Sequence, residues 1–484
     1  MTPAALPQPI ETLAVSSPVE AIMRRLESLG PGQRLALTVP APSAEPEALF
    51  DAATAIGLGE PNTTASIGQP VTDDHGLVWR PPEGPAFAGL GVAVELRLHG
   101  HERFADLRQR AGEFFDALET DALEGAEALV PRAFGGFAFD VGAADAAPWQ
   151  AFGDGCFTLP RWLYRRHEDS ADLTLTVAAS ELRQTPPDHW AKLTHSLLTA
   201  LRELAERSTF TGTRPVELPR LIEDPAADNA WASMVEDIRR AIRRGDVEKI
   251  VAARRFTVEL AASRPLARVI ERLEQRRRST AFAFARPGAT FLGLTPERLI
   301  SKRGLEFRTE ALAGSIESGA EHAAELLGSG KDRLEQQLVV DAILRRLAPL
   351  AKKLEAAARP NVRELPEVLH LHTPIHGELH APRHLLELVE LLHPTPAVGG
   401  VPTADAMAWI RANEDDARGW YAAPIGWFDA AGDGEIFVAL RSCLLLPGRA
   451  ELYAGAGIVS DSDPQRELAE VRLKLRTLMH ALAV

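Results

Sequence analysis

A lysine in the second half of the chain has a setting in which an amine could act as a base. Lys249 begins the apolar, strand-like run KIVAARRF. Because side chains alternate across a strand, Lys249 shares one face with Val251 and Ala253. The alternative is a lysine whose stem covers apolar surface while its ammonium reaches water. The strand pattern alone leaves both interpretations open.

Two expected helices offer carboxylates beside apolar stripes. In GSGKDRLEQQLVVDAILRRL, Glu335 falls inside the stripe, so it requires a proton or a cation; an intrahelical pair with Lys331 is the alternative. In the final helix, the spacing of Glu467, Glu470 and Lys474 places them on consecutive turns, where ordinary surface ion pairing is the alternative. Carboxylates from two helices favour a hard divalent cation such as Mg²⁺, which prefers oxygen ligands.

A further carboxylate lies where two strand-like runs meet. Glu297 follows Thr295-Pro296 in FLGLTPERLISKRG, so it is expected at a bend, with a plain turn carboxylate as the alternative. The runs TEALAGSIES and LYAGAGIVSDSD contain glycines between small residues. Such residues let a ligand approach the backbone and offer amide donors to an anion.

The composition of the whole chain limits the partners of such a site. The 484 residues contain 53 Lys and Arg against 67 Asp and Glu, a net charge of −14 without a basic patch, so we expect neither a nucleic-acid nor a membrane partner. The two cysteines, Cys156 and Cys443, are too few and too far apart for a disulfide scaffold. Without an apolar run of ~20 residues or a signal-peptide pattern at the start, we expect a cytoplasmic protein.

Helices and strands are expected in groups instead of strict alternation, which favours an α+β protein with mainly antiparallel strands. RLALTVPAP and VAVELRLHG have strand patterns, and residues 101–130 have a helical one. Residues 207–230, rich in Pro, Thr and Asp, are interpreted as a connector before a helix that starts at Asn229. The chain is therefore divided into residues 1–225 and 226–484.

The motifs of the second portion resemble, in order, those of the chorismate-utilising enzymes, and most closely the isochorismate synthases. They are EKIVAARR, GLTPERL, TEALAGSI, KDRLEQQLVVD, HLHTPIHGEL, LHPTPAVGGVP, WYAAPIGWFDAAGDGEIFVALRS and LYAGAGIVSDSDPQRELAEVRLKL, and they cover residues 228–482. The resemblance implies an αββα body of large antiparallel sheets layered with helices. It also implies that residues 1–225 form a sheet-forming portion packed into the same body as the chorismate-binding catalytic region, 226–484.

The resemblance assigns the chemistry. Family members that add water to chorismate carry lysine at the position of Lys249, whereas those that add ammonia typically carry glutamine. Lys249 would be the base that takes a proton from water attacking C2, and Glu297 the acid that protonates the departing C4 hydroxyl. The amine must be neutral for this role, so nearby positive charge is expected.

The resemblance also assigns binding positions. Glu335 and Glu470 would hold Mg²⁺, with Asp332 and Glu467 close by, and the metal would take the ring carboxylate of the substrate. Arg441 and Lys474 would contact the carboxylates of chorismate. The remaining expected pocket residues are Gly314, Ser315, His370 and Gly455.

Two residues depart from the family pattern. Gln336 stands where histidine is usual after the metal-binding glutamate, and Ala423 stands where glycine is common. A zinc site is disfavoured at a group of five histidines because the carboxylates give a better cofactor argument. These histidines are His370, His372, His376, His380 and His384.

The expected activity is that of a monomeric, Mg²⁺-dependent isochorismate synthase, an isomerase that feeds menaquinone, siderophore or salicylate synthesis. The main alternative is a salicylate synthase, which also eliminates pyruvate. An aminating chorismate enzyme is disfavoured by Lys249, and a catalytically silent chorismate-binding protein is disfavoured because every acid, base and metal position is filled.

Overall fold

The structure is a computed structural model that describes residues 17–58, 75–207, 219–222, 224–260, 265–274, 279–319 and 321–483. Residues 1–16, and residues 208–218 and 223 of the expected connector, lie outside this part of the chain. Within the described part, the connector contains the short strand β8 (Arg220–Leu221).

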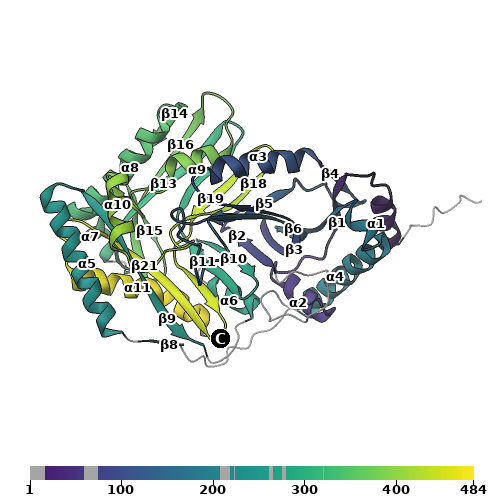
Figure 1. The fold of residues 1–484 in the computed structure, drawn as a ribbon, viewed down its shortest axis with the longest axis horizontal. Helices are drawn as coiled ribbons and strands as arrows, with labels where there is room; N and C mark the ends of the chain where they lie inside the picture. The colour runs from purple at the N-terminus through teal and green to yellow at the C-terminus, as the bar shows by residue number, and fades with distance from the viewer. Residues whose placement is uncertain are drawn as a thin grey trace, which may run out of the picture.

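The first portion contains a group of strands with helices around it (Figure 1). Its elements are α1 (Pro18–Glu27), β1 (Arg34–Pro40), α2 (Ala48–Ala55), β2 (Gly76–Arg80), β3 (Ala86–Leu98), α3 (Arg103–Asp116), β4 (Leu118–Ala122), β5 (Arg132–Phe137), β6 (Gly155–His167), β7 (Ser170–Ala178), a 3₁₀ turn (Glu181–Arg183) and α4 (Pro187–Arg207).

The second portion contributes a larger set of strands and the remaining helices (Figure 1). Its strands are β9 (Lys249–Glu259), β10 (Thr280–Arg286), β11 (Ala289–Thr295), β12 (Arg298–Arg303), β13 (Glu306–Glu317), β14 (Ala351–Ala356), β15 (Asn361–Glu364), β16 (Val368–Leu379), β17 (Gly400–Val401), β18 (Pro424–Asp429), β19 (Gly434–Val438), β20 (Ser442–Leu446) and β21 (Arg449–Ile458). Its helices are α5 (Pro225–Arg244), α6 (Leu266–Glu274), α7 (His322–Gly328), α8 (Gly330–Leu347), α9 (Leu385–Leu392), α10 (Thr403–Asn413) and α11 (Pro464–Leu482).

The strand pairing confirms the expected α+β class with mainly antiparallel strands. Among the described strands, β1 and β4 form the one parallel pair. Strands of the two portions also pair with each other, since β2 lies beside β10 and β5 beside β18, both antiparallel. The sheet network is therefore continuous across the boundary expected at residue 225.

Two expected helices differ from the structure at their ends. The helical pattern of residues 101–130 becomes α3, which ends at Asp116, followed by β4, because residues 118–122 add to β1 as a parallel strand. Sheet pairing here overrides helix propensity. Helix α5 starts earlier than expected, because the Asp224 side chain accepts hydrogen bonds from the Ala226 and Ala227 amides and Pro225 occupies the first turn.

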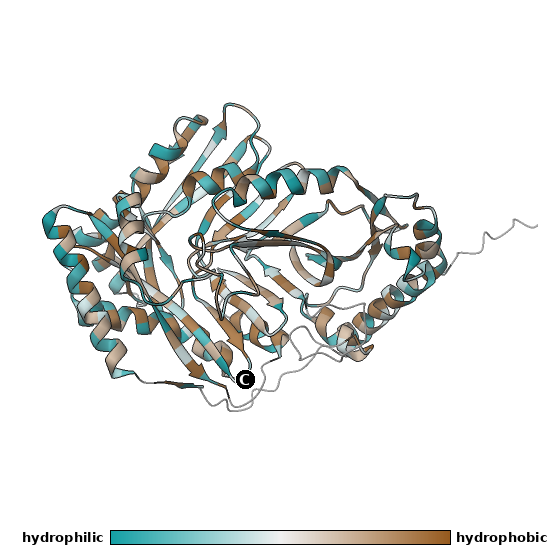
Figure 2. Ribbon diagram, viewed as in Figure 1, coloured by the Kyte–Doolittle hydropathy of each residue, from teal (hydrophilic) through white to brown (hydrophobic). Residues whose placement is uncertain are grey.

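The interior is apolar and the helices expose hydrophilic faces (Figure 2). One large cluster of buried side chains runs through both portions and includes Trp79, Trp149, Trp162, Trp231 and Trp420. None of the helices in the described ranges combines the length and the apolar character required to cross a membrane.

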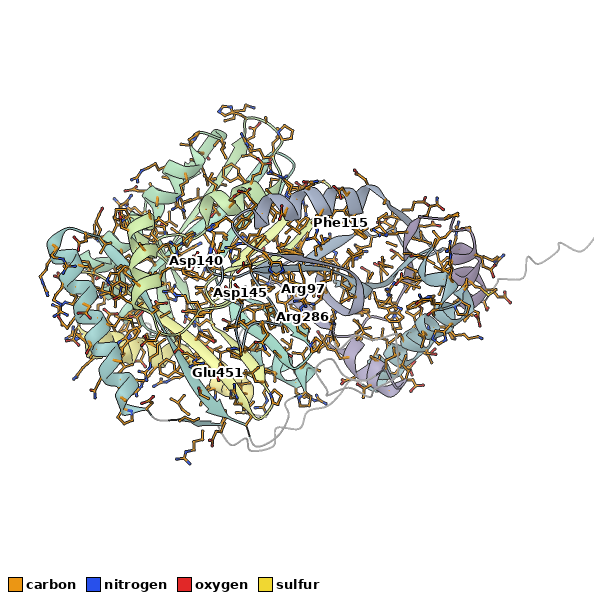
Figure 3. All side chains as sticks on the ribbon, in the orientation of Figure 1. Arg97, Phe115, Asp140, Asp145, Arg286 and Glu451 are labelled. Carbon is orange, nitrogen blue, oxygen red and sulfur yellow. The ribbon has the colours of Figure 1, made fainter. Side chains whose placement is uncertain are left out.

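The segment between β5 and β6 packs against the second portion. The Trp149 indole donates a hydrogen bond to the Tyr453 hydroxyl at 3.1 Å, and the Trp420 indole donates to the Gly153 carbonyl at 2.9 Å. Asp140, labelled in Figure 3, forms an ion pair with Arg411 of α10. This segment therefore supports the elements that carry the site described next.

Candidate active site

The expected site residues converge on one pocket of about 880 Å³, a volume that includes its open mouth. It is lined by residues of β13, α8, β16, β21 and α11 and of the bend after β11. Nine of the ten residues expected in catalysis, metal binding or substrate binding line it: Glu297, Gly314, Ser315, Glu335, His370, Arg441, Gly455, Glu470 and Lys474. Asp332 and Glu467 also line it.

Lys249, the tenth residue, lies directly behind the pocket wall. Its side chain is 0% exposed, so the interpretation in which the ammonium reaches water is wrong. Lys249 Nζ lies 2.8 Å from Glu335 Oε1. The nearest charged neighbour of the amine is therefore a carboxylate, where positive charge was expected. Val251, two residues further along the same face of β9, does line the pocket.

Gly457 makes this pairing possible. A Cβ at this position would lie 2.5 Å from Glu335 Oε1 and 2.8 Å from Lys249 Cε, both too close for a real contact. A side chain here would press on the ends of the Lys249 and Glu335 side chains, and at least one of them would have to shift. The second glycine of the GAG run thus leaves space for the Lys249–Glu335 pair.

We expect Gly457→Ala to reduce both stability and turnover. Forcing a methyl group into this contact costs about 1–3 kcal/mol of unfolding free energy and displaces the Lys249 amine. Thermal unfolding and chorismate turnover measure the two effects. Gly112→Ala in α3 is the matched control, because its Cβ would meet nothing within 4 Å. Full turnover by G457A would contradict this account of the pair.

Two further lysine–glutamate pairs border the pocket. Lys331 Nζ of α8 lies 3.1 Å from Glu467 Oε1 of α11, and Lys474 Nζ lies 2.7 Å from Glu470 Oε1 one turn away. Lys331 thus pairs with α11, and the intrahelical pair with Glu335 considered from the sequence is not formed. Lys474 also donates a hydrogen bond to the Gly455 carbonyl at 2.9 Å. The shared sector expected for Glu467, Glu470 and Lys474 is confirmed.

The donor set of this pocket fits a divalent cation with oxygen ligands. Burial and the neighbouring Glu470 raise the pKa of Glu467, and burial and Glu335 raise the pKa of Asp332, although Lys331 and Ser329 act in the opposite direction. Carboxylates that resist ionisation together are stabilised by a bound cation. Among the described residues, His99, Asp145 and Asp154 are the group of three possible metal ligands whose ligand atoms all lie within 4.8 Å of one another. These three residues do not line the pocket.

Glu297 lies at the expected bend, between β11 and β12. Its side chain is buried, and its amide donates to the Thr295 hydroxyl at 3.3 Å, while its carbonyl accepts from the Val438 amide at 3.0 Å. Burial raises the pKa of Glu297 to about 8, helped by the nearby Glu310. The group is therefore protonated near neutral pH, as a proton donor must be.

His370 and Arg441 form a polar part of the pocket wall. His370 Nδ1 lies 3.0 Å from the Gly314 carbonyl, and Arg441 Nη2 lies 3.1 Å from His370 Nε2. Burial and the Arg441 charge hold the pKa of His370 well below its usual range. The ring is thus neutral, with Nδ1 donating and Nε2 accepting. Arg441 has a φ of 47°, a left-handed conformation that is unusual outside glycine and typical of functional sites.

The small residues of the pocket are required by close packing. Gly314 has a φ of 73° at a bulge in the β13–β16 pairing, and a Cβ there would lie 2.9 Å from Asp332 Cβ. A Cβ on Gly455 would lie 2.5 Å from the Ala252 carbonyl oxygen. Ser315 follows the bulge, with its hydroxyl 3.2 Å from His370 Nδ1.

The two departures from the family pattern leave the site intact. Gln336 Nε2 donates to the Ala311 carbonyl at 3.0 Å and to the Thr373 hydroxyl at 2.9 Å, so it ties α8 to β13 and β16. It does not hold Glu335. In the YAAP run the positive φ of 59° falls on Ala422, and Ala423 is simply buried.

The group of histidines has separate local roles. His372 contacts Glu310 and Asn361, the exposed His376 lies 3.4 Å from Glu355, and His384 caps α9. In the part of the chain that is described, no three of these histidines bring their ring nitrogens together as metal ligands.

Several pocket residues were missed by sequence reasoning. Tyr421 stacks on Tyr453 with ring centroids 5.5 Å apart, and burial raises the pKa of both. Arg418 donates to Glu414 and to the Val398 and Val251 carbonyls. The WYAAP motif contains Tyr421, but the stacking depends on a partner on β21 that is distant in the chain.

The fold and the pocket together define an enzyme class: an α+β protein with a buried acid and carboxylates grouped in one cavity and a buried amine behind its wall. The description "Chorismate binding enzyme" belongs to the family profile that matches residues 41–483. The chain therefore belongs to the family of chorismate-binding enzymes.

Individual relatives agree with this assignment. The chain is 39% identical over 419 residues to the salicylate biosynthesis isochorismate synthase of Pseudomonas aeruginosa, covering 84% of each chain. It is 31% identical over 419 residues to isochorismate synthase MenF of Bacillus subtilis, covering 84% of this chain and 87% of the relative. Menaquinone-specific isochorismate synthase MenF from Escherichia coli has the same fold, with a TM-score of 0.70 at 24% identity over 95% of this chain and 98% of that one.

Proposed function

We propose that the chain is an isochorismate synthase, an isomerase that interconverts chorismate and isochorismate. The observation that carries the proposal is a buried acid with a pKa of about 8, Glu297, in a pocket backed by the buried amine of Lys249. The relatives named as isochorismate synthases support it.

The proposed reaction is an allylic displacement with one base and one acid. Lys249, which must be a neutral amine for this step and therefore cannot remain in its ion pair with Glu335, accepts a proton from water as the water oxygen bonds to C2 of the ring. Both ring double bonds shift, from C1=C2 and C5=C6 to C1=C6 and C4=C5, the C4–O bond breaks, and Glu297 gives its proton to the departing oxygen, which leaves as water. In the reverse direction the two residues exchange roles.

Substrate binding is assigned to the cationic side of the pocket. Chorismate carries two carboxylates, and Arg441 and Lys474 provide the positive charge that they require. His370 holds the Arg441 guanidinium in place from β16. Gly314, Ser315 and Gly455 line the same pocket.

Glu335 and Glu470 are the proposed Mg²⁺ ligands, with Asp332 and Glu467 beside them. Mg²⁺ binds one or two protein carboxylates and keeps other positions for substrate oxygens. When bound, the cation supplies positive charge that neutralises and orients the ring carboxylate. In the structure Glu335 and Glu470 are each paired with a lysine. A bound cation would replace the lysine ammonium as the positive partner of each carboxylate.

Removal of the metal is expected to abolish turnover. EDTA should stop the conversion of chorismate, and excess Mg²⁺ should restore it. Glu470→Gln should raise the Mg²⁺ concentration needed for half-maximal activity by about 10-fold or more, since it removes one charged ligand. Isothermal titration with Mg²⁺ alone gives a second readout. Undiminished activity in EDTA would exclude the metal role.

Product analysis tests the proposed reaction itself. Purified protein with chorismate and Mg²⁺ should yield isochorismate, identified by chromatography and mass spectrometry. Salicylate together with pyruvate would identify a salicylate synthase, and an aminated product formed with ammonia would identify an aminating enzyme. Unchanged chorismate would identify a binding protein without catalysis.

The cellular setting follows from the same proposal. Both cysteines, Cys156 and Cys443, are free and buried, which suits the reducing cytoplasm. We propose a cytoplasmic monomer whose product feeds menaquinone, siderophore or salicylate synthesis.

A further inference from the structure

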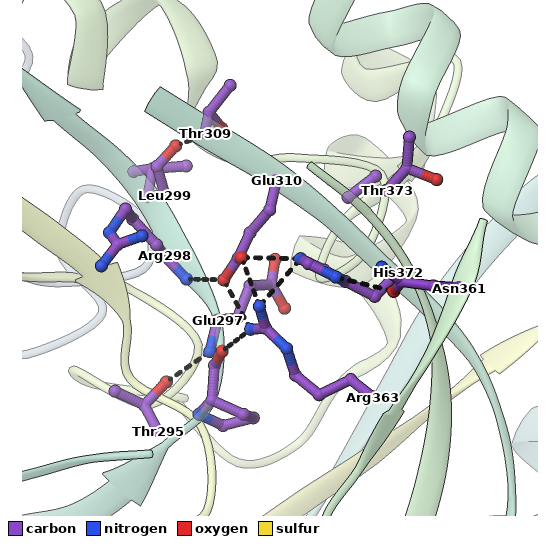
Figure 4. Close-up of polar contacts among 12 residues, drawn as sticks. Thr295, Glu297, Arg298, Leu299, Thr309, Glu310, Asn361, Arg363, His372 and Thr373 are labelled. Atoms are coloured by element: carbon purple, nitrogen blue, oxygen red, sulfur yellow. Dashed lines mark hydrogen bonds and ion pairs between the residues drawn. The ribbon is translucent and has the colours of Figure 1, made fainter. Parts of the chain in front are cut away.

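Glu310 of β13 is a second buried acid next to the proposed proton donor, and no catalytic step uses it. Its side chain is 7% exposed. Figure 4 shows its carboxylate beside Glu297, facing Arg363 and His372. The two acids therefore share one buried space at the edge of the pocket.

Glu310 is held as a carboxylate by the Arg363 guanidinium and the Arg298 amide, with the His372 ring beside it. Arg363 donates from Nη1 to Oε1 at 2.9 Å and from Nη2 to Oε2 at 2.8 Å, a two-pronged ion pair. His372 Nε2 lies 2.9 Å from Oε2, and the Arg298 amide donates to Oε1 at 2.9 Å. The His372 ring is fixed from its other side by Asn361, 2.9 Å from Nδ1.

These contacts give the two acids different protonation states. The donors hold the pKa of Glu310 at about 2, against the effect of burial. Glu297 has no donor of this kind to its side chain among the described residues, and the negative charge of Glu310 adds to the effect of burial on its pKa. Two adjacent carboxylates in one buried space therefore carry one charge, and the fixed donors determine which acid carries it.

Arg363 also connects the network to the backbone of the proton donor. Its Nη1 donates to the carbonyl of Pro296, the residue before Glu297, at 2.8 Å. The same guanidinium thus neutralises Glu310 and fixes the bend that aims Glu297.

We propose that Glu310, with Arg363 and His372, is a positioning residue that keeps Glu297 protonated for transfer of its proton to the departing hydroxyl. This inference rests on the proposed function, since it deepens the role of Glu297 in that reaction. Glu310 acts through Glu297 and makes no contact with the reacting atoms.

The charged and titratable groups around Glu297 come from several elements. They are Glu310 on β13, Arg363 on β15, His372 on β16, Lys249 on β9, and Tyr421 and Arg441 on the loops before β18 and β20. Lys249 and Arg363 oppose the effect of Glu310. When the negative charge of Glu310 is removed, Lys249 and Arg363 therefore lower the pKa of Glu297 without opposition from that charge.

The test is the pH profile of kcat/KM. Activity requires protonated Glu297, so it is lost as pH rises through the pKa of that group. In Glu310→Gln this basic limb is expected to move to lower pH by about one unit or more, because the like charge is gone and Arg363 is left unneutralised. In Arg363→Gln it is expected to move to higher pH, because the charge of Glu310 is no longer offset. The opposite directions separate this role from a general loss of structure.

Glu451→Gln is the matched control. Glu451 of β21, labelled in Figure 3, is as deeply buried and accepts from Arg449 Nε at 2.8 Å and from the Thr257 hydroxyl at 2.7 Å. Thermal unfolding establishes that each variant is folded. Basic limbs that coincide with that of the wild type in folded E310Q and R363Q would overturn the proposal.

Infrared spectroscopy separates this inference from the proposed function. The carbonyl stretch of the protonated acid, assigned from the difference between wild type and Glu297→Gln, reports the protonation of Glu297 without turnover. A titration that shifts in E310Q while E297Q remains fully active supports the positioning network and rejects the acid role. A titration that does not shift rejects the positioning network alone.

Discussion

Lys249→Met is expected to lower chorismate turnover by about 10²–10⁴-fold, the contribution of a positioned acid–base group. Methionine keeps much of the apolar stem, so the packing of the strand face is largely preserved while the amine is lost. The readout is isochorismate formation by purified, folded protein at saturating chorismate. Binding of chorismate should persist, since Arg441 and Lys474 are unchanged.

The control for this variant is Lys302→Met. Lys302 of β12 is also a buried lysine in an ion pair, with Asp433, and its ammonium donates to the Gly304 carbonyl at 3.1 Å, outside the pocket. Both variants leave a carboxylate without its lysine, so both lose stability, but K302M should keep its turnover. Near-normal isochorismate production by folded K249M would refute the role of the amine.

Glu297→Gln is expected to lower turnover by a similar ~10²–10⁴-fold factor, because an amide of the same shape cannot supply a proton to the departing hydroxyl. The wild-type enzyme should lose activity as pH rises through about 8, where burial places the pKa of Glu297. E451Q, which removes an equally buried charge elsewhere, should retain activity.

The stability of E297Q gives an independent check with a definite sign. Between pH ~4.5 and ~8 the unfolded chain releases the Glu297 proton while the folded protein keeps it. The folded state then binds more protons, so its stability falls with rising pH because of this group. E297Q lacks this loss, and its melting temperature relative to the wild type should rise across the same interval. A constant difference would mean that Glu297 titrates normally.

Local patterns predicted the parts of the site that lie on single elements. The apolar stripe of α8 correctly placed Glu335 on the buried side, and the heptad-like spacing of α11 correctly grouped Glu470 with Lys474. The Thr295-Pro296 pair correctly indicated a bend at Glu297. In each case the relevant periodicity or breaker spans fewer than about ten residues, within which backbone geometry fixes side-chain direction.

Pairings between distant elements were not predictable from those patterns. The sequence suggested Glu335, on the same helix, as an ion-pair partner of Lys331, yet the partner in the structure, Glu467, lies 136 residues away. Glu310 and His372 are 62 residues apart and meet through the β13–β16 pairing. A strand register that is set by whole-sheet packing decides such contacts, and one sequence carries no direct signal for it. The family motifs supplied the roles of the site residues, but not the network around Glu310.

The pairing of β5 with β18 has a consequence for how the chain is made. Strand β5 lies between β6, which follows it closely, and β18, which begins about 290 residues later. At about 5–20 residues per second, a ribosome needs roughly 15–60 s to reach β18 after β5 emerges. Through that time one side of β5 presents unpaired backbone groups, the arrangement from which strand-to-strand aggregation starts. The yield of folded enzyme therefore depends on how well this strand is shielded on the nascent chain until β18 is synthesised.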